Sequence, residues 1–213
     1  MGSGIHMKVK SPTQSRDAEL TKAKILDAAE EEFGQGGLAG ARTEAIAQRT
    51  GVTKAMIYYY FESKEGLYEA VLERCFQGHI QASSDPTWHE GDPAEKLEGL
   101  IRQFLARSAQ NPNLPNIVAY EALQNQGKYF KQVGVPQYYE TMARILERGM
   151  QMGVFRQVDA YHASVSIVGA CVFYFCCREN VKFLWADKDI MSPEMVAAHM
   201  DEAVNLIMRG LMI

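Results

Sequence analysis

The sequence predicts an all-α protein of about nine helices, divided into a small N-terminal domain and a larger C-terminal domain. Three observations support this fold class. Apolar residues recur at spacings of three and four through most of the chain, which is the period of an amphipathic helix. No segment alternates between apolar and polar residues as a half-buried strand does. Glycines and prolines separate the periodic segments. We place the domains at 19–79 and 80–213, after a tag and flexible arm at 1–18.

The composition excludes several classes of protein. Residues 1–7 are typical of an expression tag, and the polar stretch 8–20 is expected to be a loose arm. The most apolar run, 165–177, is shorter than the roughly 18–20 residues of a membrane span. No secretory signal is visible, so we expect a cytoplasmic protein without a membrane partner. The four cysteines have no metal-like spacing, and neither a metal nor a cofactor is expected.

Four helices are predicted in the N-terminal part. The first spans 21–35, and glycines end it. Thr43 is predicted to cap a short second helix, and Thr53 caps a third that runs to about residue 60. Gly51 supplies the turn between them, since a tight interhelical turn often needs a positive φ. Ser63 begins a longer fourth helix.

The two short helices that meet at Gly51 have the layout of a helix-turn-helix, whose second helix lies in the DNA major groove. Tyr58, Tyr59 and Tyr60 cover three faces of one helical turn, so they cannot all lie in the core. At least one hydroxyl is expected to reach a phosphate. The stretch 42–64 has four basic and two acidic residues, a mildly basic patch on a protein of net charge −4. The alternative is a plain helical hairpin with an aromatic packing patch.

Each candidate DNA contact has a chemical reason. Helix N-termini at Thr43 and Thr53 present N–H groups that suit phosphates. Lys54 stands where a recognition helix begins, and Lys64 is a candidate clamp on the DNA backbone. Small or flexible residues after Lys54 permit close approach to a thymine methyl. The predicted contacts are Arg42, Thr43, Thr53, Lys54, Ala55, Met56, Tyr58, Tyr59, Tyr60 and Lys64.

Residues 19–79 resemble the N-terminal domain of the TetR family of bacterial repressors. The resemblance rests on Ile25-Leu26, Ala28-Ala29, Phe33, Gly37, Ile46-Ala47, Gly51-Val52, Ile57-Tyr58, Phe61, Lys64-Glu65 and Leu67 in one register. It implies a three-helix DNA-binding domain, a helical ligand-binding domain, and a homodimer on a palindromic operator of double-stranded DNA. Glu44 departs from the pattern, because family members often place a base-reading or phosphate-binding residue there, and Arg42 is expected to replace that contact. Tyr59 and Tyr60 stand where histidine is common, so the operator sequence does not carry over.

Turn residues divide the C-terminal part into five helices after a loop at 84–92. They are expected at 93–110, 114–125, 138–152, 159–185 and 193–211. The last two carry apolar or small residues at spacings of three and four, which predicts a four-helix interface between two chains. These residues are Ala163, Ile167, Ala170, Tyr174, Cys177, Val181 and Trp185, then Val196, His199, Ala203, Leu206 and Gly210. The alternative is an intramolecular core built from the same residues, and the first of these two helices is expected to serve both surfaces.

A ligand pocket is expected between those helices and the preceding ones. The main lining candidates are Phe104, Tyr120, Leu123, Tyr139, Met142, Phe173 and Tyr174, with Arg178 as a polar anchor. Phe130, Tyr138 and Met150 are further lining candidates, and Glu121, Asn125 and Asn180 are alternative polar anchors. The excess of tyrosine and methionine favours a mid-sized apolar or aromatic small molecule. For each residue taken singly, core packing is the alternative interpretation.

Two other signals carry little weight. His162, Ser164 and Ser166 lie on one predicted helix, and such spacings do not assemble a nucleophile, a base and an orienting acid. Cys171 and the adjacent pair Cys176 and Cys177 are expected to be small buried hydrophobes rather than a redox sensor.

Together these features predict a DNA-binding transcriptional regulator and no enzyme. The expected mode of action is repression, with release from a palindromic operator by a small-molecule ligand. Two alternatives stay open. One is an effector-independent DNA-binding protein, and the other is a helical adaptor without DNA affinity, which the acid at Glu44 favours.

Overall fold

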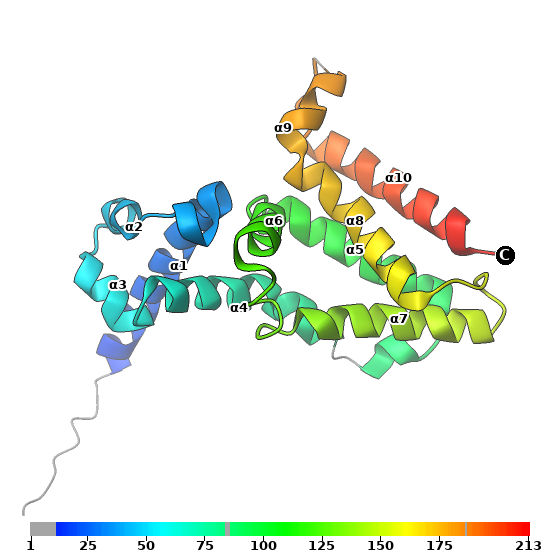
Figure 1. The fold of residues 1–213 in the computed structure, drawn as a ribbon, viewed down its shortest axis with the longest axis horizontal. Helices are drawn as coiled ribbons and strands as arrows, with labels where there is room; N and C mark the ends of the chain where they lie inside the picture. Colours follow the sequence, from blue (N-terminus) through cyan, green and yellow to red (C-terminus); the bar gives the residue numbers. More distant parts are fainter. Residues whose placement is uncertain (1–11, 84–85, 186) are drawn as a thin grey trace, which may run out of the picture.

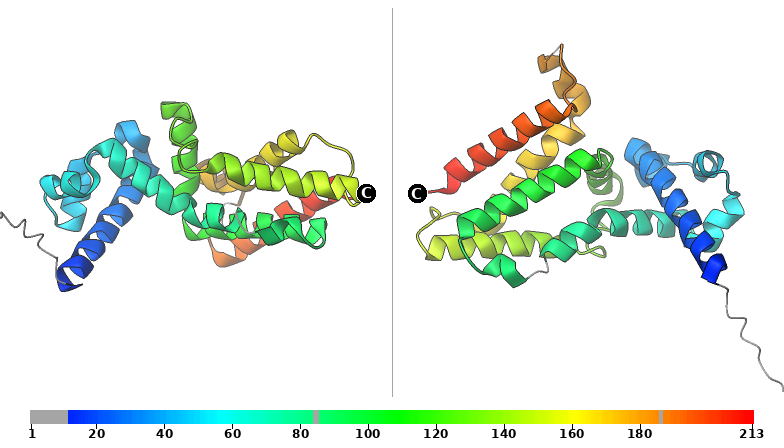
Figure 2. Two further views of the ribbon diagram at one scale, coloured as in Figure 1. Left: turned by 90° about the horizontal axis from the view of Figure 1, so that it is seen from below. Right: turned by 180° about the vertical axis from the view of Figure 1, so that it is seen from behind.

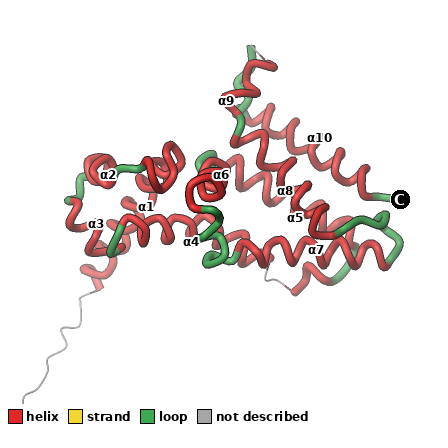
Figure 3. Tube along the Cα trace, in the orientation of Figure 1, coloured by secondary structure: helices red, strands yellow, loops and turns green. Residues whose placement is uncertain are grey.

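The computed structural model describes residues 12–83, 86–185 and 187–213, which form an elongated, all-helical molecule (Figure 1). Coloured by secondary structure, the described chain consists of helices and connecting loops without a named strand (Figure 3). The helices are α1 (Pro12–Gly40), α2 (Thr43–Thr50), α3 (Lys54–Phe61), α4 (Lys64–Ser83), η1 (Pro86–His89), α5 (Pro93–Gln110), α6 (Leu114–Asn125), α7 (Val135–Gln151), α8 (Ala160–Cys176), α9 (Arg178–Val181), η2 (Lys182–Trp185) and α10 (Pro193–Leu211). The all-α prediction is confirmed, and the described residues form ten α-helices where about nine were expected.

The N-terminal domain is a small bundle in which α1 and α4 hold α2 and α3 at one end of the molecule (Figures 1 and 2). All four helices contribute fully buried side chains to its core, including Ile25, Phe33, Ile46, Ile57 and Leu67. Full burial of such a side chain contributes about 1.5–3 kcal/mol. α4 continues through the boundary predicted at residues 79 and 80, so the two domains share this helix.

α1 begins earlier than the sequence pattern indicates. The loose arm expected for residues 8–20 is wrong from Pro12 onward, because the helix starts there. Proline is favourable in the first helical turn, and extending an existing helix costs far less than nucleating one. The Thr21 hydroxyl donates to the carbonyl of Asp17 at 2.8 Å, so Thr21 lies inside the helix rather than at its cap. Residues 1–11 lie outside the described residues.

Two glycines with positive φ shape this domain. Gly51, with φ 72°, ends α2 and donates its N–H to the carbonyl of Ala47 at 3.0 Å. Gly37, with φ 65°, kinks α1 where α6 packs closely against it. A Cβ atom at Gly37 would lie 2.3 Å from the side-chain oxygen of Gln124, so a larger residue would have to displace that side chain. The positive φ is the stronger reason for glycine at this position.

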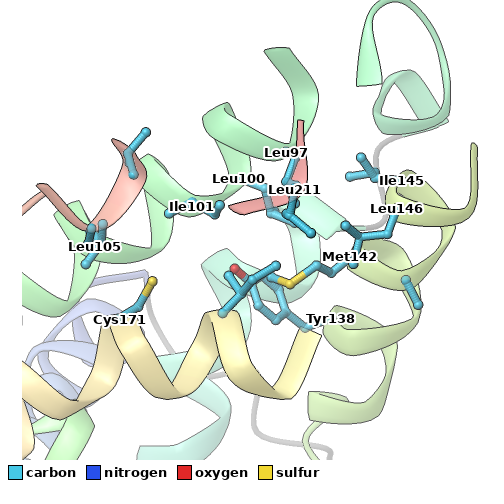
Figure 4. Close-up of a cluster of buried hydrophobic side chains, with 14 of the residues drawn as sticks. Leu97, Leu100, Ile101, Leu105, Tyr138, Met142, Ile145, Leu146, Cys171 and Leu211 are labelled. Carbon is cyan, nitrogen blue, oxygen red and sulfur yellow. The ribbon is translucent and has the colours of Figure 1, made fainter. Parts of the chain in front are cut away.

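The larger domain is a bundle of α5, α7, α8 and α10. Figure 4 shows its core, in which Leu100 and Ile101 of α5 face Met142 and Leu146 of α7 and Cys171 of α8. α6 lies between the two domains and packs against both α1 and α8. α6 and the shared α4 therefore connect the larger domain to the N-terminal domain.

The helix predicted over 159–185 is broken at Cys177. α8 ends there, and the α9–η2 segment continues at an angle of 67°. Neither glycine nor proline marks the break. Its cause is tertiary, because the chain has to return to α10, and the Tyr174 hydroxyl donates a 2.5 Å hydrogen bond to the carbonyl of Ile190 in the returning segment. No single helix of the described residues is long and apolar enough to span a membrane; only the bent pair of α8 with α9–η2 reaches that length and composition.

Two further boundaries differ from the predictions. α7 begins at Val135 rather than at residue 138, because Pro136 occupies its first turn after Gly134, where proline fits a helix. The loop predicted at 84–92 contains the short helix η1, and residues 84 and 85 lie outside the described residues.

Candidate nucleic-acid interface

α2 and α3 form the helix-turn-helix that the sequence predicts. Ile46 and Ile57 are buried between them and against α1 and α4, which fixes their relative orientation. Thr53 caps α3 as predicted, because its hydroxyl accepts the backbone N–H of Met56 at 3.2 Å. The N-terminal end of α3 is exposed, so its first turn is free to approach a major groove.

Most predicted DNA contacts on α3 lie on one exposed surface. Lys54, Ala55, Met56 and Tyr59 are all exposed, and Tyr59 is 74% exposed although it is a large aromatic residue. Tyr60 is half-buried, with the Lys22 ammonium 5.9 Å from its ring centre. Tyr60 is therefore partly a packing residue between α1 and α3.

Thr43 and Tyr58 form a hydroxyl pair between α2 and α3. Their oxygen atoms lie 3.3 Å apart, and Thr43 is only 4% exposed. The prediction that Thr43 caps α2 is wrong, because Arg42 holds the cap position and Thr43 is the first helical residue. This hydroxyl pair connects α2 to α3, and the side chain of Thr43 is buried rather than open to a partner.

Glu44 and Lys54 form an ion pair across the turn. The hydrogen bond from Lys54 lowers the pKa of Glu44, and the same bond raises the pKa of Lys54, so both groups are charged at neutral pH. The Lys54 ammonium also lies 5.8 Å from the ring centre of Tyr58. In the sequence Glu44 is visible only as a departure from the family pattern. Its pairing with Lys54 has no sequence signal, because residues ten positions apart meet only when the turn folds.

Arg42 and Lys64 flank the helix-turn-helix. Arg42 is exposed, and its backbone N–H donates to a carboxylate oxygen of Glu32 at 3.1 Å. Lys64 is half-buried at the start of α4, with its ammonium 3.4 Å from the carbonyl of Ala39. Their roles as clamps on the DNA backbone stay predictions.

The larger domain contains a small enclosed cavity of about 40 Å³. Aromatic and valine side chains line it, namely Phe76, Phe104, Val118, Phe130, Val135, Tyr138, Tyr139, Val168 and Val172. Phe104 and Tyr139 were predicted to line a ligand pocket, as were the further candidates Phe130 and Tyr138. Burial raises the pKa of Tyr139, so this wall stays uncharged at neutral pH.

Six of the main candidates, Arg178 included, do not line this cavity, and the further candidates Met150, Glu121, Asn125 and Asn180 do not line it either. Leu123 is 80% exposed on α6, and Phe173 is 58% exposed on α8, because both point away from the bundle. Met142 packs in the hydrophobic core. The remaining three are held by hydrogen bonds elsewhere: Tyr120 donates to Gln35, Tyr174 to Ile190 and Arg178 to Pro112.

Comparisons with known proteins identify the family. Residues 25–71 match the model of bacterial regulatory proteins of the tetR family, and residues 93–207 match the tetracyclin repressor-like C-terminal domain. The chain belongs to the TetR family. This TetR-family protein is a DNA-binding transcriptional regulator, in agreement with the exposed helix-turn-helix.

Individual relatives agree with this assignment. The HTH-type transcriptional repressor NicS of Pseudomonas putida is 29% identical over 95% of this chain and 97% of its own length. The HTH-type transcriptional regulator RutR of Escherichia coli is 48% identical over 29% of each chain. A crystal structure of a HlyIIR mutant protein has a TM-score of 0.69 and 25% identity, and the match covers 92% of this chain and 98% of that chain.

α8 and α10 of this TetR-family regulator leave an apolar surface uncovered. Tyr161, Val165 and Phe173 recur at multiples of four along α8, and each is more than half exposed; Leu206 of α10 is 69% exposed. We call these four side chains the apolar face. Four residues predicted for a dimer contact are instead buried within the chain, namely Ile167, Tyr174, Val196 and Ala203. α8 therefore uses one side for the core, as expected of a helix that is apolar nearly all round.

The cysteines are free thiols in the described part of the chain. Burial raises the pKa of Cys171 to about 12 and that of Cys176 to about 11. Such thiols are almost entirely protonated at neutral pH and react slowly, because the thiolate is the nucleophile.

Proposed function

We propose that this TetR-family regulator is a homodimeric repressor that a small apolar molecule releases from a palindromic operator. The observation that carries the proposal is the separation of two exposed surfaces along one helical molecule. α3 lies at one end of the molecule, and α8 and α10 lie toward the other (Figure 1). The start of α3 is exposed, and so are the side chains of the apolar face. One surface suits DNA, and the other suits a second copy of the chain.

The proposed DNA surface is the one predicted from the sequence, without Thr43 as a direct contact. Lys54, Ala55 and Met56 at the start of α3 face base edges, and the hydroxyl of Tyr59 reaches a phosphate. Lys64 and the other flanking groups hold the DNA backbone. In the homodimer, the two α3 helices lie about 34–36 Å apart, so that they enter successive major grooves.

The proposed homodimer pairs the apolar face with its copy. Each of its four apolar side chains is more than half exposed in the single chain, and a two-fold axis beside α8 and α10 buries them in a four-helix arrangement. Phe173 and Leu206 supply large side chains to this contact. Dimerisation also doubles the number of DNA contacts, which supports recognition of a palindrome.

The proposed ligand enters the enclosed cavity. At about 40 Å³ the cavity is much smaller than the roughly 300–1,000 Å³ of typical ligand sites. A ligand therefore has to displace side chains such as Phe104 and Tyr139 and to separate α7 from α8. The ligand binds this open state more tightly than the closed state, which binds DNA. Only this difference in the ligand's affinity for the two states can weaken DNA binding. Repression is supported by the name of the relative NicS.

Capture of sheared source-genome DNA by the purified full-length protein, followed by sequencing, tests the proposal. We expect enrichment of one short palindrome, and loss of that enrichment in Tyr59→Ala. A matched control is Leu123→Ala, which truncates another large exposed side chain on α6, outside both the DNA surface and the apolar face. Retention of DNA without a shared motif would contradict the operator, and equal capture by wild type and Tyr59→Ala would contradict the assigned surface.

The cavity has its own test. 1-anilinonaphthalene-8-sulfonate, a dye that fluoresces in apolar sites, should bind the wild type and weaken its hold on the captured palindrome. Val172→Leu fills the cavity and should abolish that effect while leaving DNA affinity unchanged. Ala122→Val enlarges an exposed side chain of α6, outside both the cavity and the apolar face, and serves as the control. Dye binding that is equal in all three proteins and has no effect on DNA would indicate an effector-independent DNA-binding protein.

A further inference from the structure

The ion pair between Glu44 and Lys54 occupies the part of the protein that approaches the bases. Lys54 is the first residue of α3, and the N-terminal residues of a recognition helix contact base edges. The Glu44 carboxylate contacts the Lys54 ammonium, so any base edge that Lys54 approaches is also close to Glu44. Their side chains are 67% and 45% exposed, which leaves both groups open to a partner.

Stability does not explain this pair. Exposed ion pairs contribute little to folding, because the gain in water is small and two long side chains lose freedom. The turn between the helices is already fixed by Gly51, by the Thr53 cap and by the buried Ile57. An acid at this position also opposes binding to the DNA backbone, because it repels phosphates and neutralises the Lys54 cation.

One base pair offers partners to both groups at once. In the major groove, guanine presents two acceptors, O6 and N7, which suit lysine, and cytosine presents the N4 amino donor, which suits a carboxylate. In an A·T pair, adenine presents one acceptor, N7, and the amino donor N6 on the same base, and thymine presents the acceptor O4. The donor and the acceptors are therefore not separated onto the two bases as they are in G·C. A preformed carboxylate–ammonium couple therefore matches the donor and acceptor order of G·C.

We infer that Glu44 is a specificity-determining residue that reads a cytosine, with Lys54 on the guanine of the same or the adjacent base pair. This inference rests on the proposed function, because it requires that the start of α3 enters the major groove of an operator. The Thr43–Tyr58 hydroxyl pair supports the geometry. It joins α2 to α3 one turn behind Lys54, so the carboxylate and the ammonium stay together as the helices dock.

Selection from a random duplex pool, with sequencing of the bound fraction, tests this inference on the full-length protein. The wild type should prefer G·C at one position of each half-site by about tenfold or more. Glu44→Gln should turn that preference toward A·T, because a glutamine amide pairs with adenine N6 and N7. Glu44→Ala should lose the preference at that position only. It should also bind random duplex several-fold more tightly at low salt, since Lys54 becomes free for a phosphate.

Glu31→Gln is the matched control. Glu31 is exposed and pairs with Arg49 between α1 and α2, so the variant removes the same charge and the same kind of contact elsewhere in the domain. It should leave every base preference unchanged. A wild-type palindrome that persists unaltered in both Glu44 variants would overturn the assignment of Glu44 and leave the proposed function intact. A wild type that selects no motif would overturn the proposed function and this inference together.

Discussion

The hydroxyl of Tyr68 in α4 donates a 3.1 Å hydrogen bond to the carboxylate of Glu121 in α6, and neither side chain is exposed to solvent. The same carboxylate accepts the amide of Asn125 at 2.6 Å and the backbone N–H of Tyr129 at 2.8 Å. Burial and the neighbouring Glu121 raise the pKa of Tyr68, so its hydroxyl remains a donor at neutral pH. This network joins the helix shared by both domains to the helix that lies between them.

Replacement of Glu121 should destabilise the fold strongly. Glu121→Ala leaves three donors without their acceptor, and we expect a loss of about 3 kcal/mol or more in the free energy of unfolding. Tyr68→Phe removes one hydrogen bond to a charged group and should cost about 1.5–3 kcal/mol. Urea denaturation at one fixed protomer concentration measures both losses.

Glu179→Ala, which breaks an exposed ion pair with Lys182, is the control and should cost less than about 1 kcal/mol. Equal stability of Glu121→Ala and the control would refute the structural role of the network.

Lys64→Ala should weaken binding to every DNA sequence to a similar extent. A lysine on a phosphate contributes through release of a counterion, so the slope of log Kd against log salt should fall by about one. Tyr58→Phe should also weaken binding on all sequences, but without the change in slope. Fluorescence anisotropy with operator and random duplexes over a salt series distinguishes the two variants.

The control is Lys131→Ala, which removes an exposed lysine of the α6–α7 connection and should have neither effect. An unchanged affinity in both Lys64→Ala and Tyr58→Phe would show that these residues do not contact DNA.

A charge on the apolar face should dissociate the proposed dimer. Phe173→Glu places a carboxylate where the two chains would meet, and the dimer dissociation constant should rise at least 100-fold, or about 3 kcal/mol. Sedimentation velocity over a concentration series measures the change. Leu123→Glu carries the same charge on the exposed surface of α6 and should stay dimeric. Identical sedimentation of the two variants would exclude Phe173 from the interface.

His199 should make the stability of the larger domain depend on pH. Its ring stacks on Tyr174 with a centroid separation of 4.0 Å, and burial lowers its pKa below 6.5. The unfolded chain then takes up the proton first, so the stabilisation is complete above about pH 6.5 and is lost as the pH falls below that value. His199→Gln should remove this dependence. Between pH 7.5 and 5.0, the free energy of unfolding should therefore fall more for the wild type than for His199→Gln. The difference in slope corresponds to at most about one proton, because a single imidazole is responsible.

The control for this prediction is His162→Gln, whose side chain is exposed at the start of α8. It should follow the wild type at each pH in paired urea titrations. A wild-type slope that persists in His199→Gln would assign the pH dependence to other groups.

The sequence by itself was sufficient for the fold class and for the helix-turn-helix. These depend on local chemistry: the apolar period of α1 and α4, the positive φ of Gly51, and the hydroxyl of Thr53 at an N-terminus are all properties of neighbouring residues. The family resemblance came from the same local register and agreed with the later comparisons.

Only the tertiary structure decided which sides of the apolar helices became core, cavity or surface. Tyr174 and Phe173 are adjacent and chemically alike, yet one is buried against Ile190 and the other is exposed, because α8 packs on the bundle with one side. The break at Cys177 and the Glu44–Lys54 pair have the same origin. Each depends on where a segment distant in sequence comes to lie, and a helical period carries no information about that position.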